Sequence, residues 1–329
     1  ARALASRPRR EPAALVFTAA GPGSLGDEAM LVAAGAALRE RGVLRQTIVS
    51  YGPEADWKAL GTYSDVLPFG DRYRTAFWET CEELTGALAH ATHFLVLGAD
   101  VMDGYYSPYE AVRRAIYTRL AHAAGVRAMI GGFSFNASPH PRSVAVLAAL
   151  PPAIGLIARD PVSHRRLMAR LGRPVSLGAD LAFLLQPDAE AQDHQGVRPW
   201  LEAERTAGRF LLGVNANYLV DPRHRESDTG QALIRAYAEG LSGFMTDHGA
   251  VSLVLIPHDY RRMAGRYDDL QLLQAIAGRL PEHLSAHVCV LETQLTAAAA
   301  KAIVSELDLV VSGRMHLAIA ALGSGVPAA

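Results

Sequence analysis

Short apolar runs of strand length alternate with longer amphipathic segments along almost the whole chain, and this alternation limits the folds open to it. A strand, a helix and a second strand in that order favour right-handed βαβ units, which build parallel sheets. We therefore predict an α/β fold. The expected strands are Ala14–Thr18, Gln46–Ser50, Phe94–Leu97, Ala128–Ile130, Gly155–Ala158, Phe210–Val214, Val251–Ile256, His287–Leu291 and Leu307–Val311.

The chain is long enough for two such sheets. It has 329 residues, of which 50% are hydrophobic, and a single hydrophobic core stops growing at about 250–300 residues. Residues 187–209 contain two prolines and a polar run, so we expect a linker there. The predicted domains are then residues 13–186 and 210–329. We expect the basic stretch 1–12, which no apolar segment of signal-peptide length follows, to be a disordered leader.

The net charge, the two cysteines and the absence of several known motifs exclude some classes of function. The 32 basic and 33 acidic residues leave a formal net charge of -1, which gives no overall field for nucleic acid. Cys81 and Cys289 belong to different expected elements, so we expect neither a disulfide framework nor a zinc site, and a cytoplasmic location fits best. P-loop, zinc-protease and hydrolase motifs are absent from the sequence. No apolar stretch approaches the roughly 20 residues that span a bilayer.

The last segment of the chain contains a candidate site for an anion. The expected strand Leu307–Val311 is followed by Ser312, Gly313, Arg314 and, at the start of a predicted helix, His316. The free N–H groups and the macrodipole at a helix N-terminus already favour negative charge. A cation and a titratable ring at that point are not needed by the apolar pattern, so we interpret them as functional.

A glycine-rich loop follows the first expected strand. Gly21, Gly23 and Gly26 form a loose G-x-G-x-x-G at the start of a helix that we expect to run to about Arg41. As a dinucleotide fingerprint this is weak, because Asp27-Glu28 puts two carboxylates where a pyrophosphate would bind. The alternative is that these two carboxylates only complement the helix dipole.

Other polar loops follow expected strands and should lie at the same edges of the sheets. Asp100 and Asn136 follow two strands of the first domain, and Asn215 and His258 follow two strands of the second. Ligands of doubly wound sheets bind beyond the carboxyl ends of the strands, so these loops suggest a hydroxyl-rich ligand. The alternative for each loop is ordinary turn chemistry. We expect Asp268-Asp269 to be a helix cap or a solvated face.

Several segments, which together cover nearly the whole chain, carry a resemblance to a known family. They are Gly21–Leu31, Leu97–Asp103, Ala158–Ser163 with Leu171-Gly172, Asp180–Phe183, Ile256–Asp259, and Val311–Leu317 with Gly325–Pro327. Taken in this order, they resemble the polysaccharide pyruvyl transferase family. Ser24 stands where the family usually has Asn, and Ala99-Asp100 interrupts its usual glycine-rich run, so acceptor contacts should differ.

The resemblance implies a fold and an activity. Family members resemble GT-B glycosyltransferases, with two Rossmann-like, doubly wound domains facing a central cleft; here the first would be the acceptor side and the second the donor side. They move pyruvate from phosphoenolpyruvate onto sugar hydroxyls of a cell-surface polysaccharide or its precursor, commonly as a ketal. The resemblance implies no metal and no cofactor besides phosphoenolpyruvate as co-substrate. It also implies a C-terminal end shortened relative to the family.

The acceptor would be a saccharide, free or lipid-linked. The protein would then work in the cytoplasm, either free or peripheral at the inner face of the plasma membrane. Sequence alone leaves its oligomeric state open.

The chemistry of phosphoenolpyruvate suggests roles for the candidate residues. Arg314 would bind its phosphate or carboxylate, and His316 would protonate its methylene carbon. Asp27 or Asp100 would accept the proton of the attacking sugar hydroxyl. The expected substrate-binding residues are Gly23, Ser24, Asp100, Asn136, Arg159, Asn215, His258, Ser312 and Gly313, with the alternative for Arg159 that it pairs with Asp160 or Asp180.

Two other functions remain open from sequence. Because fold does not determine function, a sugar-nucleotide-dependent GT-B glycosyltransferase could share the whole architecture. A non-catalytic protein that binds a sugar or an anion is the third hypothesis.

Overall fold

The computed structural model describes residues 11–19, 21–50, 57, 63–70, 72–188, 190, 197–218, 229–261 and 268–329. The expected leader, residues 1–12, lies outside this part of the chain except for residues 11 and 12. The chain divides into two compact units. The first comprises Ala1–Pro22 and Met30–Leu181, and the second comprises Gly23–Ala29 and Ala182–Ala329.

A parallel seven-stranded sheet forms the centre of the first unit, in the order β3-β2-β1-β4-β5-β6-β7. The chain builds outward from β1 to β3, then returns to the other side of β1 and builds outward again. This reversal creates a switch point between β1 and β4, where connections leave toward opposite faces of the sheet. The strands are β1 (Ala13–Phe17), β2 (Arg45–Ser50), β3 (Asp65–Pro68), β4 (His93–Ala99), β5 (Arg127–Phe133), β6 (Gly155–Ala158) and β7 (Ser176–Leu177).

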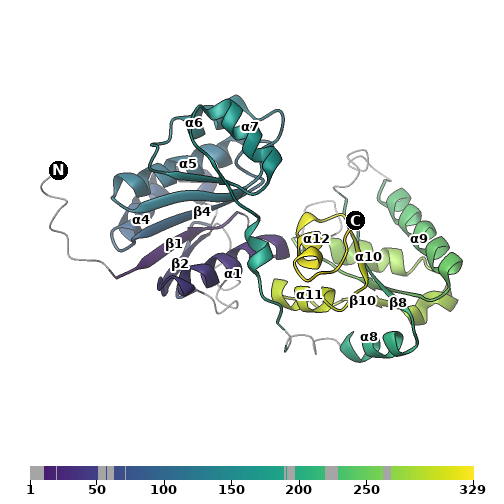
Figure 1. Ribbon diagram of the computed structural model, residues 1–329. Coiled ribbons are helices and arrows are strands. Elements are labelled where there is room, and N and C mark those ends of the chain that lie inside the picture. The colour runs from purple at the N-terminus through teal and green to yellow at the C-terminus, as the bar shows by residue number, and fades with distance from the viewer. Residues whose placement is uncertain are drawn as a thin grey trace, which may run out of the picture. The chain divides into compact units, whose positions relative to one another are not determined.

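Helices cover both faces of this sheet. Right-handed crossovers place α1 and α5 on opposite faces, because β1-α1-β2 and β4-α5-β5 advance in opposite directions (Figure 1). The buried core includes Phe17, Phe94, Ile130 and Leu167. The helices are α1 (Leu25–Glu40), α3 (Arg72–Thr75), α4 (Phe77–Leu88), α5 (Pro108–Ala123), α6 (Pro141–Ala148) and α7 (Pro161–Leu171), followed by the 3₁₀-helix η2 (Leu181–Leu184), whose first residue closes this unit.

The second unit has the same doubly wound arrangement, with four parallel strands in the order β10-β9-β8-β11. Its switch point lies between β8 and β11, which run side by side from Leu212↔Leu309 to Asn215↔Ser312. Its strands are β8 (Phe210–Asn215), β9 (Val251–Leu255), β10 (Val288–Val290) and β11 (Leu309–Ser312). Its helices are α8 (Val197–Thr206), α9 (Thr229–His248), α10 (Asp269–Ala277), α11 (Ala297–Val304) and α12 (Met315–Leu322), with the 3₁₀-helix η5 (Glu282–His287).

The expected linker, residues 187–209, includes α8, which buries Val197 and Leu201 and packs on β8. Each expected strand is present, with ends shifted by up to three residues, the largest shift being the end of β5, which was expected at Ile130 and lies at Phe133. β3 and β7 were not expected. Both are edge strands, and β7 has only two residues, so neither leaves an apolar run long enough to recognise.

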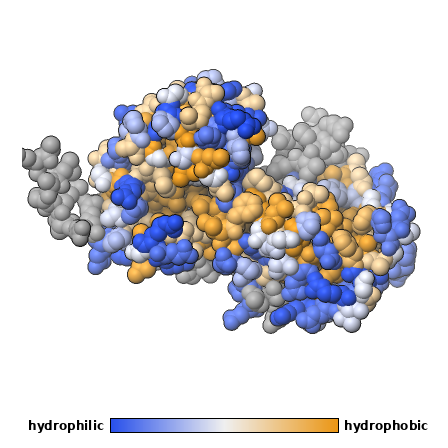
Figure 2. Space-filling model, in the orientation of Figure 1, coloured by the Kyte–Doolittle hydropathy of each residue, from blue (hydrophilic) through white to orange (hydrophobic). Residues whose placement is uncertain are grey.

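The helix after the glycine-rich loop was expected to run to about Arg41, and α1 ends at Glu40. Gly42 follows it with a φ of 77°, a left-handed conformation that glycine adopts without strain. On the side of the first unit seen in Figure 2, hydrophobic and hydrophilic side chains are interspersed. Among the described residues, no helix is both long and apolar enough to span a membrane.

Candidate functional site at the switch point of the second unit

The switch point of the second unit brings the ends of β8 and β11 to the start of α12. Asn215 ends β8 and pairs in register with Ser312, which ends β11. The N–H of Gly313 then donates to the carbonyl of Asn215 at 3.2 Å. Ser312 Oγ accepts from the N–H of Arg314 at 3.0 Å and donates to the Arg314 carbonyl at 2.8 Å. This turn fixes Arg314 at the N-cap position of α12.

The guanidinium of Arg314 is held by two buried carboxylates. Its Nη2 and Nε donate to Asp269 at 2.7 and 3.2 Å, and its Nη1 lies 3.2 Å from Asp259 Oδ2. Three of its five N–H donors thus face carboxylate oxygens of described residues, which leaves two for a ligand. The carboxylates of Asp269 and Asp259 orient Arg314 but also neutralise part of its charge.

Asp269 is the centre of this network, and the expectation of a cap or a solvated face is wrong for it. It is 2% exposed. Besides Arg314, its Oδ2 accepts from the side chain of Asn215 at 3.1 Å and from the N–H groups of His258 and Asp259. The N-cap of α10 is the neighbouring Asp268, whose side chain accepts from the N–H of Gln271. Spacing alone could not distinguish the two aspartates, because both stand at a helix start.

His258 is buried among these groups without a partner for its ring. It is 5% exposed, and neither ring nitrogen has a hydrogen-bond partner among the described residues. Burial, followed by the charges of His316 and Arg314, lowers the pKa of His258 to about 3, and the charge of Asp259 opposes this shift. The ring is therefore neutral, with one donor and one acceptor that a ligand or water could satisfy.

The first turn of α1 belongs to the second unit, as part of Gly23–Ala29. Ser24 forms an antiparallel bridge with Asp259, and the N–H of Leu25 donates to the carbonyl of His258 at 3.1 Å. Gly23, whose φ is 101°, accepts at its carbonyl from the N–H of Tyr260 at 2.8 Å. The glycine-rich loop thus adds its backbone to the edge of the site.

Gly26 and His316 meet at this edge. A Cβ on Gly26 would come within 3.0 Å of Nδ1, Cγ and Cβ of His316, so the imidazole lies against bare backbone. Asp27 lies 3.8 Å from the guanidinium of Arg261, which forms a two-pronged contact with Asp259 at 2.6 and 2.8 Å. Burial raises the pKa of Asp259, but Arg261 and Arg314 more than offset this, so its pKa lies below the ordinary value.

Glu28 does more than complement the dipole of its own helix. Its Oε1 accepts from the N–H of Ala297 at 2.7 Å, at the start of α11. Burial raises the pKa of Glu28 to about 7, and the hydrogen bond from Ala297 opposes this shift. A carboxyl that titrates near neutrality thus stands two residues after Gly26, a property that the sequence pattern does not reveal.

Asp100, Asn136 and Arg159, the remaining expected site residues, lie in the first unit. Asn136 Nδ2 donates to the buried Asp103 at 2.8 Å, and Asp100 accepts from the hydroxyl of Tyr106 at 3.0 Å. Arg159 Nη1 donates to Asp180 at 2.9 Å, and both side chains are almost fully buried; this is the pairing that was the alternative for Arg159. The expected residues in the second unit are Gly23, Ser24, Asp27, Asn215, His258, Ser312, Gly313, Arg314 and His316.

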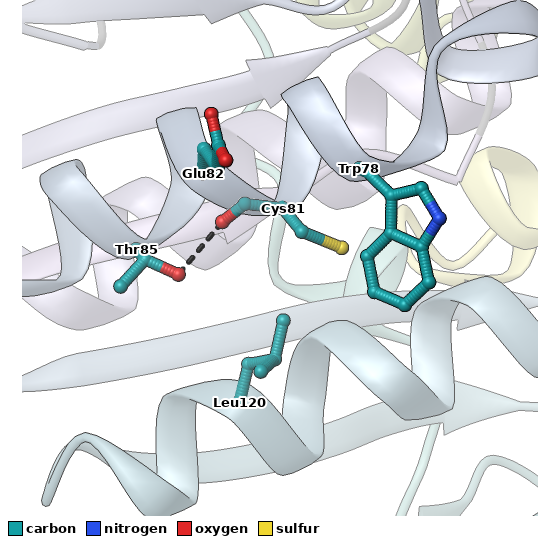
Figure 3. A pocket seen from close by; sticks show the side chains of 5 residues that line it. All are labelled: Trp78, Cys81, Glu82, Thr85 and Leu120. Carbon is teal, nitrogen blue, oxygen red and sulfur yellow. Dashed lines mark hydrogen bonds between the residues drawn. The ribbon is translucent and has the colours of Figure 1, made fainter.

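The described residues contain no candidate metal centre. No three His, Cys, Asp or Glu side chains gather in a metal-binding arrangement among them. A hollow between α4 and α5 is lined by Trp78, Cys81, Glu82, Thr85 and Leu120, and in Figure 3 the Cys81 thiol points between the Trp78 ring and Leu120. Burial raises the pKa of this thiol, which makes it a weaker nucleophile.

Solved structures of similar fold share little sequence with this chain. A putative UDP-N-acetylglucosamine 2-epimerase from Listeria monocytogenes has a TM-score of 0.56 at 13% identity, over 98% of this chain and 79% of its own. The UDP-GlcNAc 2-epimerase from Neisseria meningitidis has a TM-score of 0.57 at 11% identity, over 96% and 81%. A family 9 glycosyl transferase from Veillonella parvula has a TM-score of 0.50 at 12% identity, over 97% and 80%.

Identities this low establish the fold alone, and that fold, two Rossmann-like units with parallel sheets, is of the GT-B type. Comparison with curated proteins by sequence gives no match. The chain belongs to the polysaccharide pyruvyl transferase family, whose model matches residues 25–329. The resemblance of the motifs is thereby confirmed. Membership indicates an enzyme that transfers pyruvyl groups, with a polysaccharide as the acceptor class.

Proposed function

We propose that this protein transfers pyruvate from phosphoenolpyruvate to hydroxyl groups of a saccharide and forms a ketal. The observation that supports this most is the arrangement at the start of α12. Arg314 and His316 stand at a helix N-terminus, and the buried His258 has no partner for its ring among the described residues. An anion with both a phosphate and a carboxylate fits such a set of donors.

In this proposal the donor is bound by the second unit. The N–H groups at the start of α12 and the two remaining donors of Arg314 hold one anionic group of phosphoenolpyruvate. His258 donates a hydrogen bond from its neutral ring. Asp269 and Asp259 keep the guanidinium in place, so little side-chain freedom is lost on binding.

The reaction begins with protonation of the donor and releases its phosphate. His316 gives a proton to the methylene carbon of phosphoenolpyruvate, which becomes a methyl group and leaves an oxocarbenium-like centre at the neighbouring carbon. The oxygen of one sugar hydroxyl bonds to that carbon, and the bond to the phosphate oxygen breaks. A second hydroxyl of the sugar closes the ketal. The two hydroxyl protons, the first of them passed on by the base that accepts it, restore His316 and protonate the released phosphate.

The proton of the attacking hydroxyl needs a base. Asp27 is one candidate, because it belongs to the turn of α1 against which His316 lies, although Arg261 is near it. Asp100 of the first unit is the other candidate, and its carboxylate already accepts from Tyr106. The removal of Asp27 or of Asp100 should therefore slow turnover far more than it weakens donor binding.

Calorimetric titration tests the proposal without knowledge of the acceptor. Phosphoenolpyruvate and uridine diphosphate are titrated separately into the wild type, Arg314→Lys and His316→Gln. We expect phosphoenolpyruvate to bind the wild type and to lose about 2 kcal/mol in Arg314→Lys, the scale of a lost hydrogen bond to a charged group. His316→Gln should bind the donor with smaller loss and release no phosphate when saccharides are added.

Three other results would each point away from the proposal. Binding of uridine diphosphate without phosphoenolpyruvate would assign the protein to the sugar-nucleotide glycosyltransferases. Donor binding with no phosphate release by the wild type across a panel of saccharides would indicate a binding protein. An Arg314→Lys variant that is folded by circular dichroism and binds phosphoenolpyruvate as the wild type does would exclude Arg314 from the donor site.

A further inference from the structure

Three tyrosines stand exposed within five residues at the carboxyl end of β4. Tyr105, Tyr106 and Tyr109 are 70%, 60% and 62% exposed. The rings of Tyr105 and Tyr106 meet edge to face, with centroids 5.3 Å apart and an interplanar angle of 83°. Single exposed aromatic residues are ordinary, but here two in the loop after β4 and a third in the first turn of α5 gather amphipathic side chains within five residues of the chain.

The position of this group in the fold is that of a ligand-binding loop. The loop leaves β4 at the switch point of the first unit, where β1 and β4 are neighbours and their connections diverge. In doubly wound sheets ligands bind at this point, outside the carboxyl ends of the strands. Asp100, the first residue after β4, accepts a hydrogen bond from the hydroxyl of Tyr106 at 3.0 Å.

The start of the loop is anchored by a buried carboxylate. Asp103 is 4% exposed, and its Oδ1 accepts from the N–H of Tyr105 at 2.9 Å. Its Oδ2 accepts from both the N–H and the side-chain amide of Asn136, which follows β5. Asp103 therefore ties the loop after β4 to the loop after β5, and the tyrosine backbone is held before any ligand arrives.

The end of the loop is anchored by a buried cation. Arg114 of α5 is completely buried and pairs with Glu110 one turn earlier, next to Tyr109. Its Nη2 also donates to the carbonyl of Ala19 at 2.7 Å, just beyond β1. The first turn of α5 is thus fixed to the exit of β1. A surface fixed at both ends loses little entropy on binding.

From these observations we infer that Tyr105, Tyr106 and Tyr109, together with Asp100, form the platform on which the acceptor saccharide stacks. The inference rests on the proposed function for its acceptor class. The faces of the tyrosine rings would cover the C–H face of a pyranose, and the carboxylate of Asp100 with the phenolic hydroxyls would bind its hydroxyl groups.

The charge of the loop favours a neutral sugar over a nucleotide or phosphate. Residues 99–109 contain Asp100 and Asp103 and no Lys, Arg or His. A phosphate placed there would meet like charge with no cation in the loop to offset it. The hydroxyl groups of an uncharged sugar can instead form hydrogen bonds with the carboxylate of Asp100 and the phenolic hydroxyls of the tyrosines.

Saturation-transfer and titration NMR with methyl glycosides of galactose, glucose and mannose would test the platform. Wild type, Tyr105→Ala, Tyr106→Ala and Tyr109→Ala are compared with Trp78→Ala, the matched control, which removes a ring that is 78% exposed on α4 of the same unit. We expect at least one glycoside to bind the wild type and each tyrosine variant to lose about fivefold or more in affinity. Trp78→Ala should bind as the wild type does.

The tyrosine-to-phenylalanine variants separate stacking from hydrogen bonding, because they keep the ring; we expect them to retain most of the affinity. Equal losses in Trp78→Ala, unchanged affinity in all three alanine variants, or no binding of any glycoside to the wild type would overturn the platform. Phosphoenolpyruvate is titrated into the same samples. Glycoside binding without phosphoenolpyruvate binding would support the platform and refute the proposed function. Phosphoenolpyruvate binding without glycoside binding would support the donor site of the proposed function and refute the platform.

Discussion

The imidazole of His316 lies directly against the α carbon of Gly26, and a methyl group at that position would overlap Nδ1, Cγ and Cβ of the ring. The two residues are 290 positions apart in a chain whose pattern gives no reason to pair them. A glycine is therefore required at position 26, because the His316 ring occupies the space where any other side chain would begin. The glycine-rich loop accommodates a histidine where its spacing suggests a phosphate.

Gly26→Ala should displace His316 and lower the rate of phosphate release by about tenfold or more, since a shift of this size removes the acid from line with its target. Gly240→Ala is the matched control, because Gly240 lies in α9 with nothing near its Cβ position. Both changes raise helix propensity by up to about 1 kcal/mol. Equal rates in the two variants, measured with a saccharide that the wild type pyruvylates, would contradict this role for Gly26.

Asp269→Asn should lower the free energy of unfolding by about 3–5 kcal/mol, because it breaks a buried ion pair and leaves Arg314 partly uncompensated. Its neighbour provides the control. Asp268→Asn should be nearly neutral, since Asn caps a helix as well as Asp does. Urea denaturation of both variants measures the difference, and a similar small loss in each would show that Asp269 is no more than a second cap.

The free energy of unfolding should depend on pH through Glu28 and His258, whose pKa values shift in opposite directions on folding. Folding lowers the pKa of His258 from 6.5 to about 3, so between these values its unfolded state binds the extra proton and stability rises with pH. Folding raises the pKa of Glu28 from 4.5 to about 7, so in that window the folded state binds the extra proton and stability falls as pH rises. The two contributions cancel between about pH 4.5 and 6.5.

Single variants should uncover each contribution. Compared with the wild type, the free energy of unfolding of Glu28→Gln should rise more steeply with pH between about 4.5 and 6.5, by up to about 1.4 kcal/mol per pH unit. His258→Leu should change the slope by a similar amount in the opposite direction, and the double variant should regain the wild-type slope. Urea titrations at several pH values test this, and parallel curves for all four proteins would refute both linkages.

The pair Arg159 and Asp180 should behave as a structural unit. Arg159→Met removes the buried guanidinium that pairs with Asp180 and should cost about 3–5 kcal/mol of stability, whereas Arg159→Met with Asp180→Leu should recover much of that loss. Phosphoenolpyruvate affinity should not change in the double variant. A double variant that is stable but no longer binds phosphoenolpyruvate would instead show that Arg159 takes part in donor binding.

The fold could be predicted from sequence because buried parallel strands leave apolar runs that need no tertiary information. β8 and β11 were expected within one or two residues of their observed ends, whereas the two-residue edge strand β7 leaves no such run. The site could be predicted in part, since residues that follow strands must lie at the carboxyl edge of the sheet. Arg314 and His258 were found in this way.

Asp269 and Glu28 show why the rest could not be predicted. Each stands at the start of a helix, where the dipole alone explains an acidic residue. Their distinct roles come from what the fold packs against them, namely Arg314 and three other residues around Asp269, and the first N–H of α11 beside Glu28. Packing of this kind depends on the whole chain, so no local pattern encodes it.

The grouping of Gly23–Ala29 with Ala182–Ala329 means that no cut at a single peptide bond can release the second unit whole. A fragment that starts at Ala182 would lack Ser24, which bridges to Asp259, and Gly26, which lies against His316. It would also lack Glu28, whose carboxyl accepts from the first N–H of α11. Such a fragment should need that seven-residue piece supplied in trans, as in fragment complementation. Exchange of C-terminal units between relatives would then succeed only when the first turn of α1 is exchanged with them.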